Sequence, residues 1–148
     1  MLALTFEIAG QRYGLNVTQI VEVLPALPLR QLPHVPEYIA GVFRYRGSMV
    51  PVIDLSQLIA GKRAASLLST RIVIVRHPGP SGSGRSLGLL AERATNLDEA
   101  AAEPISTGFR TPQASYLGGI SSAGTMIQYV NVENLLPDDL RERLFAEE

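Results

Sequence analysis

Apolar residues alternate with other residues at the start of the chain, a pattern typical of strands with one buried face. The alternation covers residues 2–8 and resumes over 13–17, with a turn at Ala9-Gly10-Gln11 between the two segments. It therefore predicts a β-hairpin. Further apolar or β-branched runs predict short strands at 20–24, 42–46, 49–55, 71–76, 87–94 and 127–132.

Proline and glycine punctuate these strands and leave room for little helix. Four prolines within 25–36 predict an ordered connector, because proline lacks an amide donor and extends the residue before it. Short helical segments are expected at 37–40, at 56–60 before Gly61, at 98–102 and at 138–148, with loops over 78–84 and much of 96–113. Many short strands with few helices predict an all-β fold, closed as small barrels.

One segment of the chain occurs twice. Tyr38–Ile59 resembles Tyr116–Leu136, and the two copies align without a gap from Gly47 and Gly124 onward. A unit used twice predicts two similar half-domains packed together. The copies differ most before this glycine, where Phe43-Arg44-Tyr45-Arg46 stands against Ser121-Ser122-Ala123.

Composition limits the class of protein. With 148 residues, 46% of them hydrophobic and 18% charged, the chain can bury a core as one domain or as two small lobes sharing it. A net charge of −1 provides no field that would attract nucleic acid or an anionic membrane. The chain has no cysteine, no run long enough to cross a membrane and no signal-peptide pattern, so we expect a cytoplasmic protein without disulfides.

Few residues are candidates for catalysis. Asp54 lies between a strand and the expected helix at 56–60, where it could act as a catalytic carboxylate or as a helix N-cap. Capping is favoured, because Asn131 is its equivalent in the repeat and asparagine caps but cannot act as a base. His34 and His77 lie in loops without a paired ligand, so neither a metal nor a cofactor is expected. The enzyme alternative is a small hydrolase or transferase using Asp54, His34 and Ser48.

The strand Phe43–Arg46 alternates aromatic and basic side chains and has three interpretations. It could stack bases and bind phosphates, it could be an ordinary strand with inward aromatics, or it could bind a protein. The near-neutral charge disfavours nucleic acid, which remains the alternative function. Glu22, on an apolar strand, is either an exposed charge or a partner contact.

Several motifs in order along the chain resemble a known family. The chain is similar to CheW-type chemotaxis coupling domains over nearly its whole length, most specifically from Gly41 to Leu55. The motifs are Tyr13-Gly-Leu-Asn-Val, Ile20-Val-Glu-Val, Leu32-Pro, Pro36-x-x-Ile-x-Gly-Val, Arg46-Gly, Val50-Pro-Val-Ile-Asp-Leu and Tyr116-Leu-Gly-Gly-Ile.

This resemblance implies two five-stranded SH3-like barrels packed on a shared hydrophobic core, with a short C-terminal helix at 138–148. The whole chain would be one such domain, with approximate subdomains at 10–64 and 70–136. The resemblance also implies a non-enzymatic adaptor that joins chemoreceptor signalling tips to the regulatory domain of a CheA-type histidine kinase. Such a protein would be cytoplasmic, recruited to membrane receptor arrays, and able to form rings with similar domains.

By motif position, the resemblance implies that Val17, Ile20, Glu22 and Arg46 face the receptor. The chain departs from the family pattern in three places. The usual Asn-Leu-Arg-Gly is Arg44-Tyr45-Arg46-Gly47, Glu92 replaces an aspartate, and Arg93 stands where a small or apolar residue is commoner. We therefore expect Arg44, Tyr45 and Arg93 to adjust the choice of partner, as in a dedicated or alternative chemosensory pathway.

Overall fold

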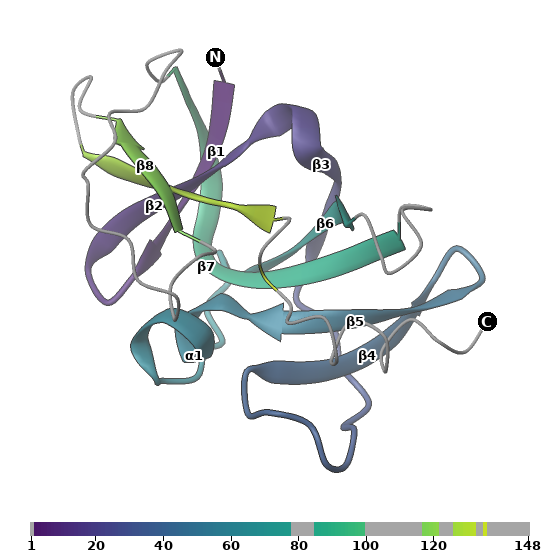
Figure 1. Ribbon diagram of the computed structural model, residues 1–148. Helices are drawn as coiled ribbons and strands as arrows, with labels where there is room; N and C mark the ends of the chain where they lie inside the picture. The colour runs from purple at the N-terminus through teal and green to yellow at the C-terminus, as the bar shows by residue number, and fades with distance from the viewer. Residues whose placement is uncertain (1, 78–84, 100–116, 122–125, 133–134, 136–148) are drawn as a thin grey trace.

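The protein is built mainly from β-strands (Figure 1). The computed structural model describes residues 2–77, 85–99, 117–121, 126–132 and 135. The helical segments are a 3-10 turn η1 (Val17–Gln19) and the helix α1 (Leu55–Ala60). The strands are β1 (Leu2–Ile8), β2 (Gln11–Asn16), β3 (Ile20–Pro25), β4 (Ile39–Tyr45), β5 (Ser48–Asp54), β6 (Arg71–His77), β7 (Arg85–Glu99), β8 (Leu117–Ser121) and β9 (Ile127–Val130).

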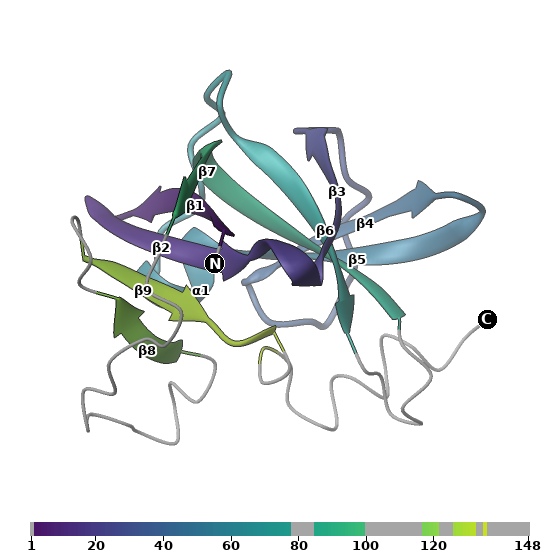
Figure 2. The same cartoon turned by 90° about the horizontal axis from the view of Figure 1, so that it is seen from above.

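The strands form two five-stranded sheets that share β7. One sheet has the order β8-β9-β2-β1-β7, and the other has the order β4-β5-β7-β6-β3. Residues 85–91 of β7 pair with β6, and residues 92–99 lie beside β1. Figure 2 shows the two sheets on either side of this strand. The prediction of an all-β fold with two five-stranded units is confirmed.

β7 bends where it passes from one sheet to the other. Arg93 has a φ of 54°, in the left-handed region that a residue with a side chain rarely adopts. The β1–β7 ladder shifts register nearby, between Thr5 and Glu7. An irregularity of this kind bends a strand and increases its twist, which lets one strand serve two differently oriented sheets.

The two sheets do not follow the expected ranges 10–64 and 70–136. β2 lies parallel to β9 in the first sheet, although these strands come from opposite ends of the chain. β6 pairs with β3 in the second sheet, and β7 pairs with both β5 and β1. Each sheet therefore takes strands from both halves of the sequence.

The sequence repeat corresponds to equivalent strand pairings. β4–β5 and β8–β9 are both antiparallel hairpins, and each second strand lies parallel to a strand from elsewhere in the chain. Val52 and Tyr129 are equivalent in the repeat, and they pair with Gly88 and Gly14 respectively. A Cβ on Gly88 would lie 3.0 Å from Val52 Cγ2, and a Cβ on Gly14 would lie 2.9 Å from Ile127 Cγ2. Both junctions therefore require glycine for the same steric reason.

The core has two parts, and β6 contributes to both. Val73 and Val75 face a large cluster shared by the two sheets, which includes Leu4, Phe6, Leu15, Leu87 and Val130. Ile72 and Ile74 face a smaller cluster enclosed by the second sheet, together with Val50 and Val52. A strand that is buried on both faces needs apolar residues at every position. This explains the continuous apolar sequence Ile-Val-Ile-Val at residues 72–75.

The helix α1 begins one residue before the predicted start at Ser56, and its ends at Asp54 and Gly61 are capped as the sequence predicts. The carboxylate of Asp54 accepts a hydrogen bond from the Gln57 amide at 3.1 Å, and Gly61 ends the helix with a φ of 73°. The predicted helical turn at 37–40 is wrong, because β4 begins at Ile39. The turn at 98–102 is wrong for Asp98 and Glu99, which end β7. The predicted helix 138–148 and the Gly124 turn lie outside the described residues.

Candidate partner-binding site

The tip of the β4–β5 hairpin lies against β3, where it forms a cluster of polar contacts. Tyr45 and Ser48 pair across the hairpin, so that Arg46 and Gly47 are the two turn residues. Both have positive φ, 49° and 82°, as a tight two-residue hairpin turn requires. This geometry directs Tyr45 and Arg46 towards Glu22 of β3.

Glu22, Tyr45 and Arg46 are joined through a single carboxylate oxygen. The Tyr45 hydroxyl donates to Glu22 Oε1 at 2.5 Å, and Arg46 Nη2 donates to the same oxygen at 3.2 Å. The Arg46 guanidinium carbon lies 5.1 Å from the centre of the Tyr45 ring, within the range of a cation–π contact. The Glu22 carboxylate is therefore held from two sides, and we call these three residues the Glu22 cluster.

The contacts in the Glu22 cluster make the Tyr45 hydroxyl less acidic. The hydrogen bond to Glu22 raises the pKa of Tyr45 above its ordinary value of 10.0, and burial adds to the shift. The positive charge of Arg46 opposes the shift. Tyr45 is therefore a neutral hydrogen-bond donor at physiological pH.

Burial differs among the members of the cluster. The side chain of Arg46 is 71% exposed, and that of Glu22 is 38% exposed. The rings of Phe43 and Tyr45 face inward and pack against the smaller core cluster. Their centres are 6.2 Å apart, with the ring planes tilted by 56°. The arginine is thus available to a partner, whereas the aromatic rings support it from below.

The other two predicted receptor-facing residues lie next to the cluster in the chain but do not join it. Val17 begins the turn η1, which is fixed by a hydrogen bond from the Thr18 amide to Asn16 Oδ1 at 3.0 Å. Ile20 begins β3 and is partly buried against the shared core. The structure therefore brings Glu22 and Arg46 into contact, whereas Val17 and Ile20 lie in the segment that leads into β3.

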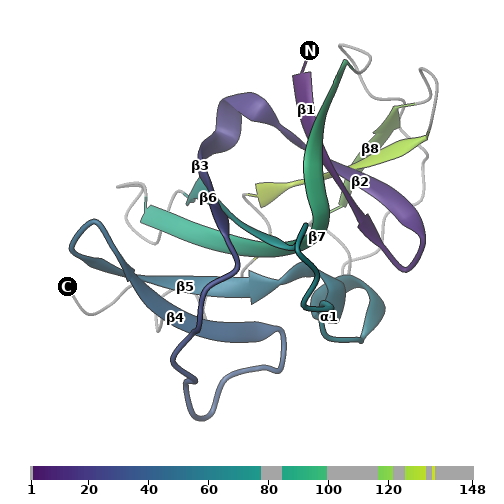
Figure 3. The same cartoon turned by 180° about the vertical axis from the view of Figure 1, so that it is seen from behind.

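The three residues predicted to adjust partner choice lie in different places. Tyr45 belongs to the Glu22 cluster, and Arg44 is exposed on β4, opposite Met49 of β5. Arg93 Nε forms an ion pair of 2.9 Å with Glu7 Oε2 and lines a cavity of about 540 Å³ beside α1. Figure 3 shows that α1 and the β4–β5 tip lie on opposite sides of the molecule. Arg93 therefore cannot act together with the Glu22 cluster.

Exposed residues that neighbour the Glu22 cluster along its strands carry no motif and were not predicted as site residues. Val21 and Val23 alternate with Glu22 along β3 and are about 40% exposed, and Met49 on β5 is 51% exposed. Arg76 follows the buried Ile72 and Ile74 at the same spacing on β6, and it is exposed. The alternation within each strand is the signal that could have identified them.

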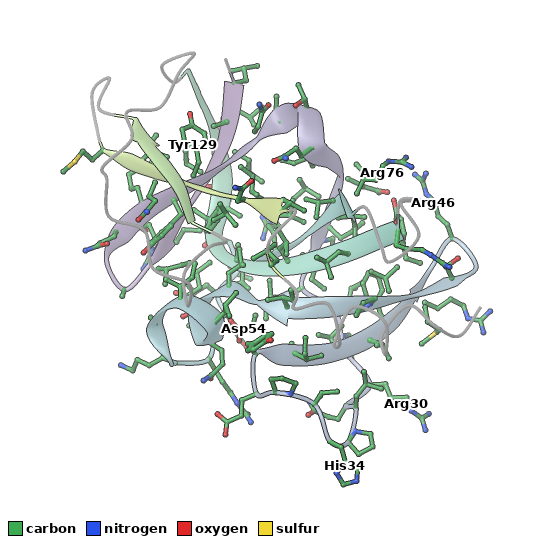
Figure 4. The ribbon with its side chains drawn as sticks, viewed as in Figure 1. Arg30, His34, Arg46, Asp54, Arg76 and Tyr129 are labelled. Atoms are coloured by element: carbon green, nitrogen blue, oxygen red, sulfur yellow. The ribbon has the colours of Figure 1, made fainter. Side chains whose placement is uncertain are left out.

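The residues of the alternative enzyme do not converge. Both carboxylate oxygens of Asp54 accept backbone hydrogen bonds, from Gln57 and from Ala64, and the residue is 5% exposed. Ser48 and Asp54 are the two ends of β5, which places them about 20 Å apart. His34 projects from the connector loop, away from Asp54 (Figure 4). Asp54 acts as a cap.

The alternative nucleic-acid interpretation also loses its stacking surface, because Phe43 and Tyr45 face the core. Within the described part of the chain, no group of three or more His, Asp and Glu side chains is arranged to hold a metal ion. No helix in the same part is long and apolar enough to span a bilayer.

Comparison with known proteins identifies the family. The CheW-like domain family model matches residues 2–140. The chain belongs to the CheW-like domain family.

Its relatives span comparable lengths. The chain is 26% identical over 145 residues to the chemotaxis protein CheW of Rhizobium meliloti, covering 94% of this chain and 89% of that protein. It is also 26% identical over 140 residues to CheW of Klebsiella aerogenes, covering 92% and 81%. The crystal structure of the scaffolding protein TtCheW from Thermoanaerobacter tengcongensis superposes with a TM-score of 0.78 at 23% identity, covering 92% of this chain and 87% of that one. The predicted family and fold are confirmed.

Proposed function

We propose that this protein is a non-enzymatic adaptor that binds chemoreceptor signalling tips and a CheA-type histidine kinase at the same time. The membership of the CheW-like family and the names of its relatives support a chemotaxis scaffold. The observation that carries the receptor side of the proposal is the Glu22 cluster, which holds an exposed arginine in a fixed position.

Receptor binding is assigned to the face around this cluster. Arg46 and Glu22 set the orientation and specificity of the bound helix, because paired charges at the rim of an interface discriminate between partners. Val17 and Ile20 supply apolar contact beside them. An amphipathic receptor helix would place its apolar side on these residues and its polar side on the charges.

Adaptor function requires no bond-making chemistry. Each contact is modest, and assembly under a receptor array raises the effective concentration of every partner. The protein acts in the cytoplasm at membrane receptor arrays, where it can alternate with kinase domains of similar fold. Arg44, Tyr45 and Arg93 distinguish this chain's partners from those of its relatives.

The test reconstitutes the three components. A soluble chemoreceptor signalling fragment and a CheA-type kinase from the same genome are mixed with the full chain, and co-sedimentation and kinase autophosphorylation are measured. The wild-type protein should form a ternary complex and activate the kinase. If no cognate pair forms such a complex or shows activation, the proposal is wrong.

A single variant locates the receptor site. Arg46→Glu should lower the affinity for the receptor fragment about tenfold or more, since it places a second negative charge beside Glu22. Its free energy of unfolding should change by less than about 1 kcal/mol, because the guanidinium is mainly exposed. Arg30→Glu is the matched control, because Arg30 is an exposed arginine far from the cluster (Figure 4). Unfolding of Arg46→Glu would instead make Arg46 a structural residue.

A further inference from the structure

A second arginine, Arg76, faces the same end of the second sheet as the Glu22 cluster. Ile72 and Ile74 of β6 point into the smaller core cluster. Side chains alternate along a strand, so Arg76 points to the same face as these two residues, one step beyond the core. It is exposed, and within the described part of the chain its guanidinium has no hydrogen bond or ion pair.

The register of the sheet places Arg76 near Glu22. Glu22 lies directly opposite Ile74 in the β3–β6 ladder, and therefore on the same face. Arg76 is two residues beyond Ile74, which places it diagonally across from Glu22, beside the register shift between Ile20 and Glu22. Figure 4 shows Arg46 and Arg76 projecting at the same edge of the molecule.

The charges at this edge are not balanced. Glu22 is the carboxylate of the cluster, and its Oε1 already accepts from both Tyr45 and Arg46. Among the described residues, Arg46 is paired with this carboxylate, and Arg76 is a second guanidinium at the same edge without an ion pair. On a chain with a net charge of −1, this excess is a local feature rather than part of a general positive field.

We propose that Arg76 and Arg46 together bind an acidic side chain of the receptor helix. Guanidinium groups present planar arrays of donors that match a carboxylate, and two of them facing one gap can hold it from both sides. Val21 and Val23 flank Glu22 along β3 and, by alternation, project from the opposite face of this strand. They add exposed apolar surface beside the charged edge, which suits an amphipathic helix better than a free anion. Arg76 is therefore a specificity-determining residue, and this inference rests on the proposed receptor binding.

The experiment measures the affinity of the full chain for a soluble chemoreceptor signalling fragment from the same genome, at two salt concentrations. Three variants are compared with the wild type: Arg76→Glu, Arg76→Gln and the control Arg30→Glu. Each acidic residue at the tip of the fragment is then changed to arginine in turn and tested against Arg76→Glu. Circular dichroism and thermal unfolding verify that every variant is folded.

Arg76→Glu should weaken binding about tenfold or more, and Arg76→Gln should weaken it less, whereas Arg30→Glu should bind as the wild type does. Arg76→Glu should also reduce the loss of affinity at high salt. One charge-reversed fragment should recover binding to Arg76→Glu. If Arg76→Glu binds like the wild type, or no charge-reversed fragment recovers binding, this inference is overturned while the proposed function stands. Absence of wild-type binding to every fragment would overturn both.

Discussion

The two parallel-strand junctions and the tip of the β4–β5 hairpin contrast in what they require of the sequence. The two junctions contain equivalent residue pairs, Val52–Gly88 and Tyr129–Gly14. Each pair needs glycine, because a Cβ there would meet a side chain of the neighbouring strand. At the tip, Tyr45 and Arg46 contact Glu22 through polar atoms near the surface. The repeated positions specify the fold, whereas the segment found in only one copy is free to specify a partner.

The largest effect should come from filling a junction. Gly88→Val would bring side-chain atoms against Val52 and Ile72, whose Cγ2 atoms lie 3.0 and 3.1 Å from the position of a Cβ. We expect a loss of about 3 kcal/mol in the free energy of unfolding, measured by chemical denaturation. Gly14→Val should show a similar loss. Gly10→Asn is the control, because Gly10 has open space around it and a positive φ that asparagine tolerates. Equal stability of Gly88→Val and Gly10→Asn would contradict the junction argument.

Truncation of the aromatic ring at the tip should have the next largest effect. Tyr45→Ala removes a ring that packs against the smaller core cluster, and should cost about 2 kcal/mol of stability. Tyr45→Phe keeps the ring and removes the donor to Glu22, and should cost less than about 1 kcal/mol. Both values come from denaturation curves. A loss for Tyr45→Phe as large as that for Tyr45→Ala would assign the stability to the hydroxyl rather than the ring.

Substitution of Asp54, the N-cap of α1, tests whether asparagine, its equivalent in the second copy of the repeat, can cap the helix as well. Asp54→Ala removes the acceptor for the Gln57 and Ala64 amides and should cost about 1–2 kcal/mol. Asp54→Asn, which places the residue of the second copy in the first, should retain most of that stability at neutral pH. Thermal unfolding distinguishes the two variants. A loss for asparagine equal to that for alanine would mean that the charge, rather than the cap, stabilises the helix.

The smallest effect concerns the acidity of Tyr45. Glu22→Gln removes the charged acceptor, so the raised pKa of Tyr45 should fall towards 10.0. NMR titration of the ring Cζ resonance measures it. The wild-type hydrogen bond stabilises the folded state fully below the ordinary pKa, and this contribution is lost as pH rises through the raised pKa. An unchanged pKa in Glu22→Gln would exclude Glu22 as the cause.

Local features were predictable from the sequence because they depend on neighbouring residues. The first hairpin, the strands around Gly47 and the Asp54 and Gly61 ends of α1 all followed from alternation and turn chemistry. The exchange of strands between the halves did not, because periodicity shows that a strand is buried but not which strand it pairs with. The pairing of β2 with β9 joins segments more than a hundred residues apart.

The candidate site was predictable in part. Glu22 and Arg46 were identified from the family resemblance, and the structure adds their contact and the role of Tyr45 in it. For Arg93 the sequence predicts a role in partner choice, which stays a prediction, but it does not predict the local structure of this residue. Its positive φ and its ion pair with Glu7 depend on the bend of β7, which no local pattern reveals.

The sharing of β7 between the two sheets has a consequence for the unfolding of the protein. A strand of 15 residues is hydrogen-bonded in both sheets, and the large core cluster lies across both of them. Loss of either half of β7 from its sheet exposes part of that common core, so neither sheet has a stable state of its own. The two sheets should therefore melt in a single cooperative transition.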